Sequence, residues 1–463
     1  MPLPHTFSLL VLGQGSTGLD VARWAAAHLG DRVSSVTVYG GASSTATPAT
    51  RALEARGVAF AYGTEKVEGA YDVCVASPGI SEFSEFFSSA AAASGEIMGE
   101  PEFAWRLSPE RWIAVTGTNG KTTTTSLVNH LLKAGGIPCE AVGNIGTVPT
   151  SAVDGRAERS WFAAELSSYQ LATTSEFHPR AAVLLNITPD HLAWHRTHEN
   201  YAAANMRAFA NMGAGDLAVV CMDDEGAAAQ APLVRSTGAA VCEVALRDTG
   251  AERAAYVEGD TLCVRSEDGV HALLPVRELG IAGEHNVLNA LAASAVAVWV
   301  GAVDARVAEG LRSFRPLEHR IEPCGTVDGV RFVNDSKATN TDAVEKALTA
   351  FPDDDVVVML GGHDKGTDLD AFARDVVAHV RAAVCFGEAR SRFSSALAAA
   401  DVSGDVEVAE ADNLAEAFDV ARALAHEGTV VLLSPACSSF DEFSGFEERG
   451  RRFKELVAAA SAR

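Results

Sequence analysis

One segment near the end of the first quarter of the sequence constrains the fold most: WIAVTGTNGKTTTTSLVNHLLKAGG, residues 112–136. The apolar run that ends at Thr116 is typical of a buried strand. Apolar residues at helical spacing from Leu127 to Leu132 predict a helix, which Gly135 and Gly136 end. A glycine-containing loop between a strand and a helix presents backbone N–H groups and a helix N-terminus to an anion. The segment therefore predicts a phosphate-binding loop in an α/β domain.

This loop is shorter than the usual nucleotide-binding loop, which places a glycine five residues before its Gly-Lys pair. Here Val115 occupies that position, and the first glycine is Gly117. We expect Lys121 to reach the terminal phosphates of a nucleotide and the hydroxyl of Thr122 to bind Mg²⁺. The residues predicted to hold the nucleotide in this loop are Gly117, Thr118, Asn119, Gly120, Lys121, Thr122 and Thr123.

Bulk composition limits the class of protein. At roughly 150 residues per domain, 463 residues predict about three domains. A net charge of -24 argues against nucleic acid and an anionic membrane surface as partners. The eight cysteines include no Cys-x-x-Cys pair, which disfavours zinc and redox motifs and fits a reducing cytosol. The N-terminus lacks the basic region of a signal peptide, and we expect a cytoplasmic protein in which the apolar stretch 287–303 is a buried helix.

The order of strand-like and helix-like segments predicts an α/β fold class with three domains. Residues 1–108 begin with strand, glycine turn and helix, and predict a Rossmann-like domain. Residues 109–313 contain the phosphate loop and predict a central P-loop-type ATPase domain. Residues 314–463 carry four apolar runs separated by helical stretches, and predict a smaller Rossmann-like domain with a mostly parallel sheet.

The glycines of the first domain do not indicate a dinucleotide site. Gly13, Gly15 and Gly18 stand in G-x-G-x-x-G order, but the second strand ends in Tyr39-Gly40 without the acidic residue that would hold a ribose. The loop at 117–121 is also the better nucleotide site. A dehydrogenase is therefore disfavoured.

The string GTNGKTT resembles the nucleotide loop of the Mur ligase superfamily, which also includes folylpolyglutamate synthetases. The resemblance covers essentially the whole chain. Within the family, the sequence is most similar to the branch that adds D-glutamate to UDP-N-acetylmuramoyl-L-alanine. Further segments match in the family's order: GNIG (143–146), ELSSYQL (165–171), NITPDHL (186–192), GEHNVLNALAA (283–293), EHR (318–320), NDSKATN (334–340), GGHDKGTD (361–368) and SPACSSFDEF (434–443).

This resemblance implies roles for particular residues. It assigns catalysis to Lys121, Glu165, His191 and Lys337, and Mg²⁺ binding to Thr122, Glu165 and His191. It adds Asn286, Asn289, Arg320 and Asp335 to the ATP site. UDP-N-acetylmuramoyl-L-alanine would be held by Ser16, Thr17, Gly79 and Asn144, and D-glutamate by Thr339, Lys365, Ser439, Phe440 and Phe446. The domains at 1–108, 109–313 and 314–463 would thus bind the UDP substrate, ATP and glutamate.

The implied reaction is ATP-driven amide formation in peptidoglycan precursor synthesis. A carboxylate attacks the γ-phosphate of ATP to give an acyl phosphate, which the amine of glutamate then attacks. We expect a monomer whose third domain closes onto the central one.

One position departs from the family's pattern. A carbamylated lysine usually bridges a second metal ion there, but the stretch reads HENYAAANMRAF with Asn205 in that place, and no lysine lies between Lys133 and Lys337. A neutral amide offers an oxygen without charge, so a second Mg²⁺ should bind more weakly. Either Asn205, water and substrate phosphate complete the site, or the ligase activity is weakened or redirected. We expect activity that does not depend on added bicarbonate.

Other hypotheses stay open at this point. A relative could take L-glutamate as acceptor or join glutamate to a folate, although the SPACSSFDEF segment and the N-terminal glycine unit argue against folate. A catalytically silent nucleotide-binding protein is the alternative outside the ligases.

Overall fold

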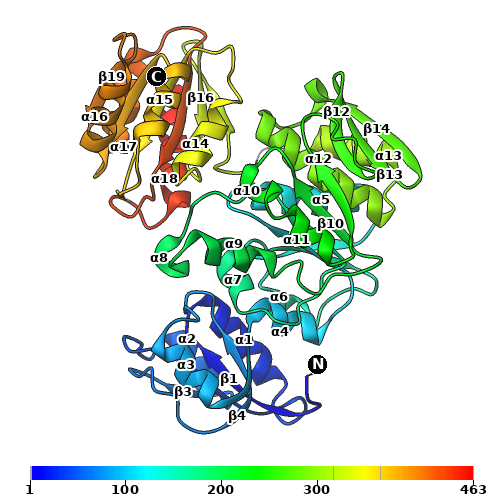
Figure 1. Cartoon of the computed structure of the whole chain (residues 1–463). Coiled ribbons are helices and arrows are strands. Elements are labelled where there is room, and N and C mark those ends of the chain that lie inside the picture. The colour runs from blue at the N-terminus through cyan, green and yellow to red at the C-terminus, as the bar shows by residue number, and fades with distance from the viewer. Residues whose placement is uncertain (1–2, 316, 365, 462–463) are drawn as a thin grey trace. The chain divides into compact units, whose positions relative to one another are not determined.

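The structure, a computed structural model, describes residues 3–315, 317–364 and 366–461. Three parallel-rich sheets with helices packed on them confirm the predicted α/β fold class (Figure 1). The chain forms two compact units, Met1–Glu278 with Leu288–Arg312, and Leu279–Val287 with Ser313–Arg463. The first unit contains two of the sheets and the second unit contains the third. The predicted borders at 108/109 and 313/314 stay predictions.

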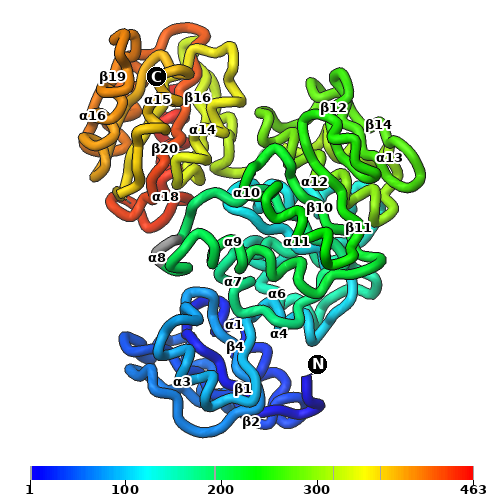
Figure 2. Tube along the Cα trace, viewed as in Figure 1, coloured from blue at the N-terminus to red at the C-terminus, as the bar shows by residue number. Residues whose placement is uncertain are grey.

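The first sheet is fully parallel and lies in the blue part of the chain in Figures 1 and 2. Its strands are β1 (Phe7–Leu12), β2 (Val33–Tyr39), β3 (Ala59–Ala61), β4 (Tyr71–Ala76) and β5 (Ser94–Gly99), with helices α1 (Ser16–Ala27), α2 (Pro48–Glu54), α3 (Glu85–Ala92) and α4 (Glu100–Leu107). Val21 of α1 and Phe103 of α4 pack with Leu9 on one face. Phe86 of α3 packs with Leu10 on the other. The strand order β3-β2-β1-β4-β5 reverses between β1 and β4, which is where such sheets form a binding crevice.

The second sheet carries the predicted phosphate loop. Its strands are β6 (Trp112–Thr116), β7 (Cys139–Gly143), β8 (Trp161–Glu165), β9 (Ala181–Leu184), β10 (Leu217–Cys221), β11 (Ala240–Val244), β12 (Ala254–Glu258), β13 (Thr261–Ser266) and β14 (Gly269–Pro275). Its helices are α5 (Lys121–Ala134), α6 (Pro149–Ala152), α7 (Ser168–Ala172), α8 (Leu192–His195), α9 (His198–Met206), α10 (Glu225–Ala228) and α11 (Ala231–Ser236); a 3₁₀ turn (Val276–Glu278), α12 (Glu284–Val300) and α13 (Asp304–Ser313) follow.

The strand order of this sheet is β14-β13-β12-β11-β10-β9-β6-β8-β7. Strands β6 to β12 run parallel, and β13 and β14 add an antiparallel edge. Strand β6 lies inside the sheet, between β9 and β8, and is buried on both faces, which explains its unbroken apolar run. Leu171 of α7 and Tyr201 of α9 pack with Ala114, while α5 contacts β6, β7 and β8.

The third sheet is parallel except at one edge. Its strands are β15 (Glu322–Val327), β16 (Val330–Asn334), β17 (Val356–Gly361), β18 (Ala382–Phe386), β19 (Glu407–Ala411) and β20 (Val430–Ala436), in the order β15-β16-β20-β17-β18-β19. Its helices are α14 (Thr341–Leu348), α15 (Asp370–His379), α16 (Arg390–Ala400), α17 (Leu414–Leu424) and α18 (Phe446–Ser461). Phe372 of α15 packs with Val358 on one face, and Phe453 of α18 packs with Phe332 on the other.

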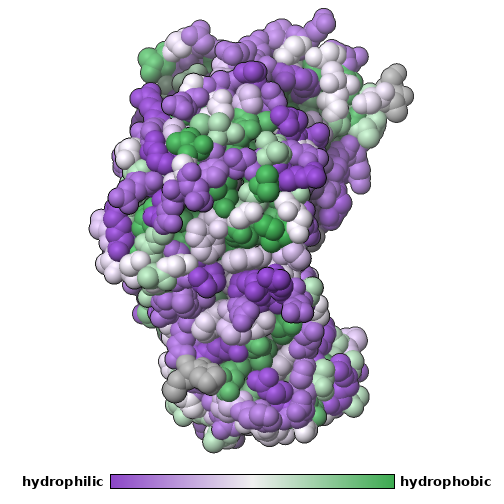
Figure 3. All heavy atoms as spheres, turned by 90° about the vertical axis from the view of Figure 1, so that its right-hand side faces the viewer, coloured by the Kyte–Doolittle hydropathy of each residue, from purple (hydrophilic) through white to green (hydrophobic). Residues whose placement is uncertain are grey.

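The cysteines are distributed over all three sheets. None of the eight, all of which the structure describes, forms a disulfide, and only Cys324 is half-buried rather than buried. Burial raises the pKa of the Cys139, Cys242 and Cys385 thiols to about 12. On the face drawn in Figure 3, apolar residues form small groups among hydrophilic ones. Among the described helices, none is long and apolar enough to cross a membrane.

Candidate active site

The loop at 117–120 leaves the carboxyl end of β6 and enters α5. Gly117 and Gly120 have φ angles of 136° and 82°, which favour glycine. A Cβ on Gly117 would lie 3.0 Å from the carbonyl oxygen of Asn186, and one on Gly120 would lie 2.6 Å from Oδ1 of Asn289. The two glycines therefore let the loop run close to its neighbours, as a tight anion cradle requires.

Asn186, which follows β9, holds this loop in shape. Its side chain accepts a hydrogen bond from the backbone N–H of Asn119 at 2.7 Å and donates one to the carbonyl of Asn119 at 3.1 Å. The backbone N–H of Thr118 donates to the carbonyl of Asn186 at 3.0 Å. Sequence analysis named the segment of Asn186 but missed this bracing role, because the contact joins two strand ends far apart in the chain.

Lys121 lies against the loop it belongs to. Its Nζ donates to the carbonyl oxygens of Gly117 and Thr118 at 2.6 and 2.8 Å. The first helical turn also contains Thr122, which is half-buried, and Thr123, which is buried. A cation folded over a strand-to-helix loop is placed to neutralise phosphate charge.

Glu165 ends β8, next to the loop. Val115 of β6 pairs in register with Glu165, so the carboxyl ends of these strands are neighbours. The carboxylate is buried, with 2% of the residue exposed. Oε1 accepts a hydrogen bond from Nδ2 of Asn144 at 3.0 Å, and no donor among the described residues reaches the buried Oε2. A buried carboxylate oxygen of this kind is costly unless a cation or donor meets it.

His191 follows β9, which borders β6 on its other side. Its φ is 55°, and its backbone N–H donates to the side chain of Asp190 at 2.8 Å. The imidazole lies 4.8 Å from the ring of Tyr169 and 6.4 Å from that of Tyr201. Burial raises the pKa of Tyr169 to about 12, so this phenol stays neutral. The loop, Glu165 and His191 thus come from three adjacent strand ends.

Of the predicted asparagines on α12, Asn289 contacts the phosphate-loop helix. Its Oδ1 accepts a hydrogen bond from Oγ1 of Thr124 at 3.1 Å. Asn286 donates to the carbonyl of Ala282 at 2.6 Å. Both side chains are nearly buried.

Three of the four predicted UDP-substrate residues follow strands β1 and β4 of the first sheet, and the fourth, Asn144, follows β7 of the second. Ser16 and Thr17 begin α1, and Gly79 follows β4. The two loops touch, because the backbone N–H of Ser77 donates to the carbonyl of Leu12 at 3.0 Å. These three residues therefore share the point at which the strand order reverses, and their role in binding the UDP substrate stays a prediction.

In the second unit, Lys337 and Phe446 meet directly. The Lys337 ammonium lies 3.9 Å from the centre of the Phe446 ring, a cation–π contact. Ser439 is buried, and its Oγ has no hydrogen-bond partner among the described residues. Thr339 is half-buried and Phe440 is 70% exposed. Lys365 lies outside the residues that the structure describes.

Asp335, which follows β16, is a buried carboxyl group. It accepts hydrogen bonds from Oγ of Ser434 at 2.7 Å and from the backbone N–H of Ile321 at 3.2 Å. Burial raises the pKa of Asp335 to about 7. Arg320 is half-buried, next to Ile321.

Arg449 on α18 is a residue that sequence analysis missed. It is fully buried, and its guanidinium donates to Oγ and the carbonyl of Ser336 at 3.0 and 2.9 Å. It also donates to the carbonyls of Cys437 and Ser438 at 3.0 and 3.3 Å. A Cβ on Gly362 would lie 2.9 Å from the guanidinium. Arg449 thus links the loops after three neighbouring strands, β16, β20 and β17.

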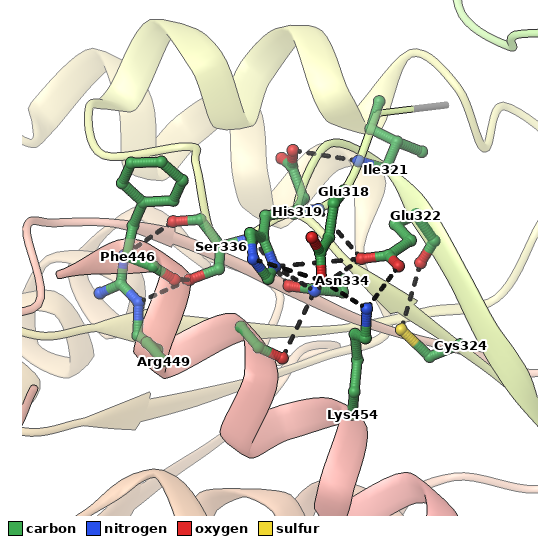
Figure 4. A network of polar contacts seen from close by, with 12 residues as sticks. Glu318, His319, Ile321, Glu322, Cys324, Asn334, Ser336, Phe446, Arg449 and Lys454 are labelled. Atoms are coloured by element: carbon green, nitrogen blue, oxygen red, sulfur yellow. Dashed lines mark hydrogen bonds and ion pairs between the residues drawn. The ribbon is translucent and has the colours of Figure 1, made fainter. Parts of the chain in front are cut away.

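A second polar network lies beside Arg449 (Figure 4). The ammonium of Lys454 lies 2.8 Å from both Glu318 and Glu322. Nδ2 of Asn334 lies 2.9 Å from Nδ1 of the buried His319 and 3.0 Å from Glu322. This network attaches α18 to the start of the second unit's sheet, and so supports the loops that Arg449 joins.

Two side chains at the carboxyl ends of these strands offer oxygen donors that fit a Mg²⁺ ion. The buried Oε2 of Glu165 and the hydroxyl of Thr122 are oxygen donors of the kind Mg²⁺ prefers. Within the described ranges, no cluster of three or more His, Cys, Asp or Glu side chains could hold a metal ion. Glu165 would therefore share such an ion with Thr122 and phosphate oxygens.

Two family models match the chain. Residues 115–297 match the Mur ligase middle domain, and residues 319–437 match the Mur ligase, glutamate ligase domain. The first range contains the phosphate loop, Glu165 and His191, and the second contains Lys337 and Asp335.

Curated relatives match over most of their length. A UDP-N-acetylmuramoylalanine–D-glutamate ligase from Pelotomaculum thermopropionicum is 38% identical over 454 residues, covering 97% of each chain. The protein of the same name from Solibacter usitatus is 39% identical over 401 residues, covering 87% of this chain and 88% of the relative.

Solved structures share the fold. The pseudomurein peptide ligase type C from Methanothermus fervidus has a TM-score of 0.59 at 16% identity, covering 98% of this chain and all of that one. The UDP-N-acetylmuramate-alanine ligase MurC from Thermotoga maritima has a TM-score of 0.58 at 20% identity, with the same coverage.

Proposed function

The chain belongs to the Mur ligase family, and on that premise we propose that it joins D-glutamate to UDP-N-acetylmuramoyl-L-alanine with ATP as energy source. The observation that carries this proposal is the 38% identity to a D-glutamate ligase over 97% of both chains. The cradle, lysine and buried carboxylate at adjacent strand ends are the parts that ATP-driven carboxylate activation needs.

The proposed reaction has two balanced steps. An oxygen of the terminal carboxylate attacks the γ-phosphorus of ATP, the bond to the bridging oxygen breaks, and ADP leaves. The amine of glutamate then attacks the carbonyl carbon of the acyl phosphate; phosphate leaves, and the nitrogen loses a proton as the amide forms. Lys121 would release the loop carbonyls and bind the phosphates.

A Mg²⁺ ion held by Glu165 and Thr122 would neutralise charge on the phosphates when bound. Asn144 fixes Glu165 through the hydrogen bond to Oε1, whereas Oε2 has no donor among the described residues. Asn144 is therefore proposed both to orient this carboxylate and to meet the muramoyl end of the substrate. The imidazole of His191 would lie at the neighbouring strand end.

The glutamate site is proposed in the second unit. Lys337 offers a cation, Phe446 an apolar wall, and Ser439 a buried hydroxyl with no hydrogen-bond partner in the part of the chain that the structure describes. Thr339, Phe440 and Lys365 complete the set by resemblance. Ser16, Thr17 and Gly79 would hold the UDP group, and Asn286, Asn289, Arg320 and Asp335 the nucleoside and phosphates of ATP. Because the substrates are soluble nucleotides and an amino acid, we propose that the protein acts in the cytoplasm.

The test is a coupled assay of ADP release with UDP-N-acetylmuramoyl-L-alanine and either D- or L-glutamate. We expect release that requires the UDP substrate and D-glutamate, and a loss of about a hundredfold or more in Lys121→Ala, because phosphate charge is no longer neutralised. Lys133→Ala is the matched control, since Lys133 is an exposed lysine on the same helix. ADP release that ignores glutamate, or prefers the L-isomer, would contradict the proposal.

A further inference from the structure

Asn205 is a buried asparagine in the last turn of a helix beside the nucleotide loop. It lies on α9, and none of its surface is exposed. An asparagine inside a helix is unfavourable unless its side chain finds partners. Its environment therefore shows what the residue does.

Both polar atoms of the amide have protein partners. Nδ2 donates to the carbonyl oxygen of Tyr201, one turn earlier, at 2.8 Å. Oδ1 lies 2.7 Å from Oγ1 of Thr116, and the same hydroxyl lies 2.9 Å from the carbonyl oxygen of Leu166. The single hydroxyl hydrogen of Thr116 is thus shared between two acceptors.

These partners lie where the nucleotide site is built. Thr116 is the last residue of β6, from which the loop leaves, and Leu166 directly follows Glu165. The same helix reaches the loop again, since the hydroxyl of Tyr201 lies 2.8 Å from Oγ1 of Thr118. Helix α9 therefore ties the loop and the Glu165 strand end together through uncharged groups.

This geometry does not fit a ligand of a second metal ion. The Asn205 oxygen is engaged by Thr116 in a position closed to solvent. By contrast, the His191 side chain is 45% exposed. A metal at Asn205 would have to displace a buried hydrogen bond and would find no charge there.

We propose that Asn205 is a positioning residue for the nucleotide site: its amide bridges α9 to the ends of β6 and β8, in place of a second metal ligand. The inference rests on the proposed ATP site. It implies that the bridge supports nucleotide binding whether or not Mg²⁺ is present.

The test measures binding of the non-hydrolysable ATP analogue AMP-PNP by titration calorimetry, with and without Mg²⁺. We expect Asn205→Ala to weaken binding by about ten- to a hundredfold in both conditions, since buried groups lose their partners. Asn200→Ala is the matched control: Asn200 is exposed on the same helix, and we expect a change of less than about twofold. Thermal unfolding shows whether each variant is folded.

Thr116→Val supplies a second route if Asn205→Ala fails to fold. It removes only the bridging hydroxyl, and we expect the same Mg²⁺-independent loss. Unchanged AMP-PNP affinity in the folded variants would overturn the proposal. A loss of affinity seen only when Mg²⁺ is present would also overturn it. None of these results depends on which amino acid the enzyme accepts, so failure of the proposed ligase activity would be seen separately.

Discussion

Replacing Arg449 by methionine would remove the buried guanidinium while keeping an unbranched side chain of similar length. The change leaves the carbonyl oxygens of Ser336, Cys437 and Ser438 without this donor. Among the described residues, no carboxylate forms an ion pair with Arg449. The main loss is therefore one of hydrogen bonds.

The magnitude follows from two opposing effects. At about 2 kcal/mol for each buried carbonyl that loses its donor, the variant loses about 6 kcal/mol. Burial lowers the pKa of Arg449 from 12.5 to about 10. That shift corresponds to about 3 kcal/mol against the charged form, which methionine no longer incurs. The net loss is then about 3 kcal/mol, or a melting temperature about 6–12 °C lower for a domain of this size.

Scanning calorimetry measures this loss, and steady-state kinetics shows its site. We expect the KM for D-glutamate to rise more than the KM for ATP, because Ser336 adjoins Lys337 and Ser438 adjoins Ser439. Arg451→Met is the matched control: it is the same substitution on the same helix, at an exposed position.

A melting temperature of Arg449→Met equal to that of the Arg451→Met control would contradict this prediction. The prediction would also be wrong if both KM values rose together, since a clamp on the glutamate loops should affect glutamate first. Arg449→Lys keeps the positive charge but loses the planar guanidinium, and a single ammonium cannot reach all three carbonyl oxygens. This variant therefore shows how much of the effect comes from geometry and how much from charge.

Two further predictions concern the first unit. Burial raises the pKa of Glu100 to about 7, from 4.5 in the unfolded chain. Between these two values the folded protein holds a proton that the unfolded chain has lost. The contribution of Glu100 to stability is therefore full below pH 4.5 and is lost as the pH rises through 7. Glu100→Gln keeps the acceptor for the Thr150 hydrogen bonds and should melt higher than the parent above pH 7; equal pH slopes in the two proteins would rule this out. Gly143→Ala would place a Cβ 2.3 Å from the carbonyl oxygen of Glu165 at a φ of 105°, so we expect a lower melting temperature and weaker nucleotide binding. The control is Gly155→Ala, where an added Cβ has nothing within 4 Å and should change neither. Similar melting temperatures for the two variants would contradict this prediction.

Much of the fold could be predicted because parallel strands leave long apolar runs. Strands β6, β17, β18 and β20 are buried throughout and were predicted from such runs. Strand β19 was not predicted: it is an edge strand of sequence EVAEA, and only its last residue is buried. A short edge strand carries little apolar signal, and its pairing with β18 is decided by the tertiary fold.

The site was partly predictable for a related reason. Loop residues at strand ends were identified because glycine, lysine and threonine at fixed spacing have local meaning. Arg449 could not be, since FEERGRRF contains several charged residues and only packing decides which one is buried. For Asn205 the sequence raised the idea of a weak metal ligand; its bridge to Thr116 joins positions 89 residues apart and has no local signal.

The burial of the cysteines gives the molecule built-in reporters of its own fluctuations. A thiol reagent attacks the thiolate, and burial both hides the sulfur and opposes its ionisation. A reagent can therefore label Cys74 only when the first sheet opens, Cys242 only when the second opens, and Cys385 only when the third opens. With Cys324 as the most accessible of the eight, the sequence of labelling would show which sheet loosens first.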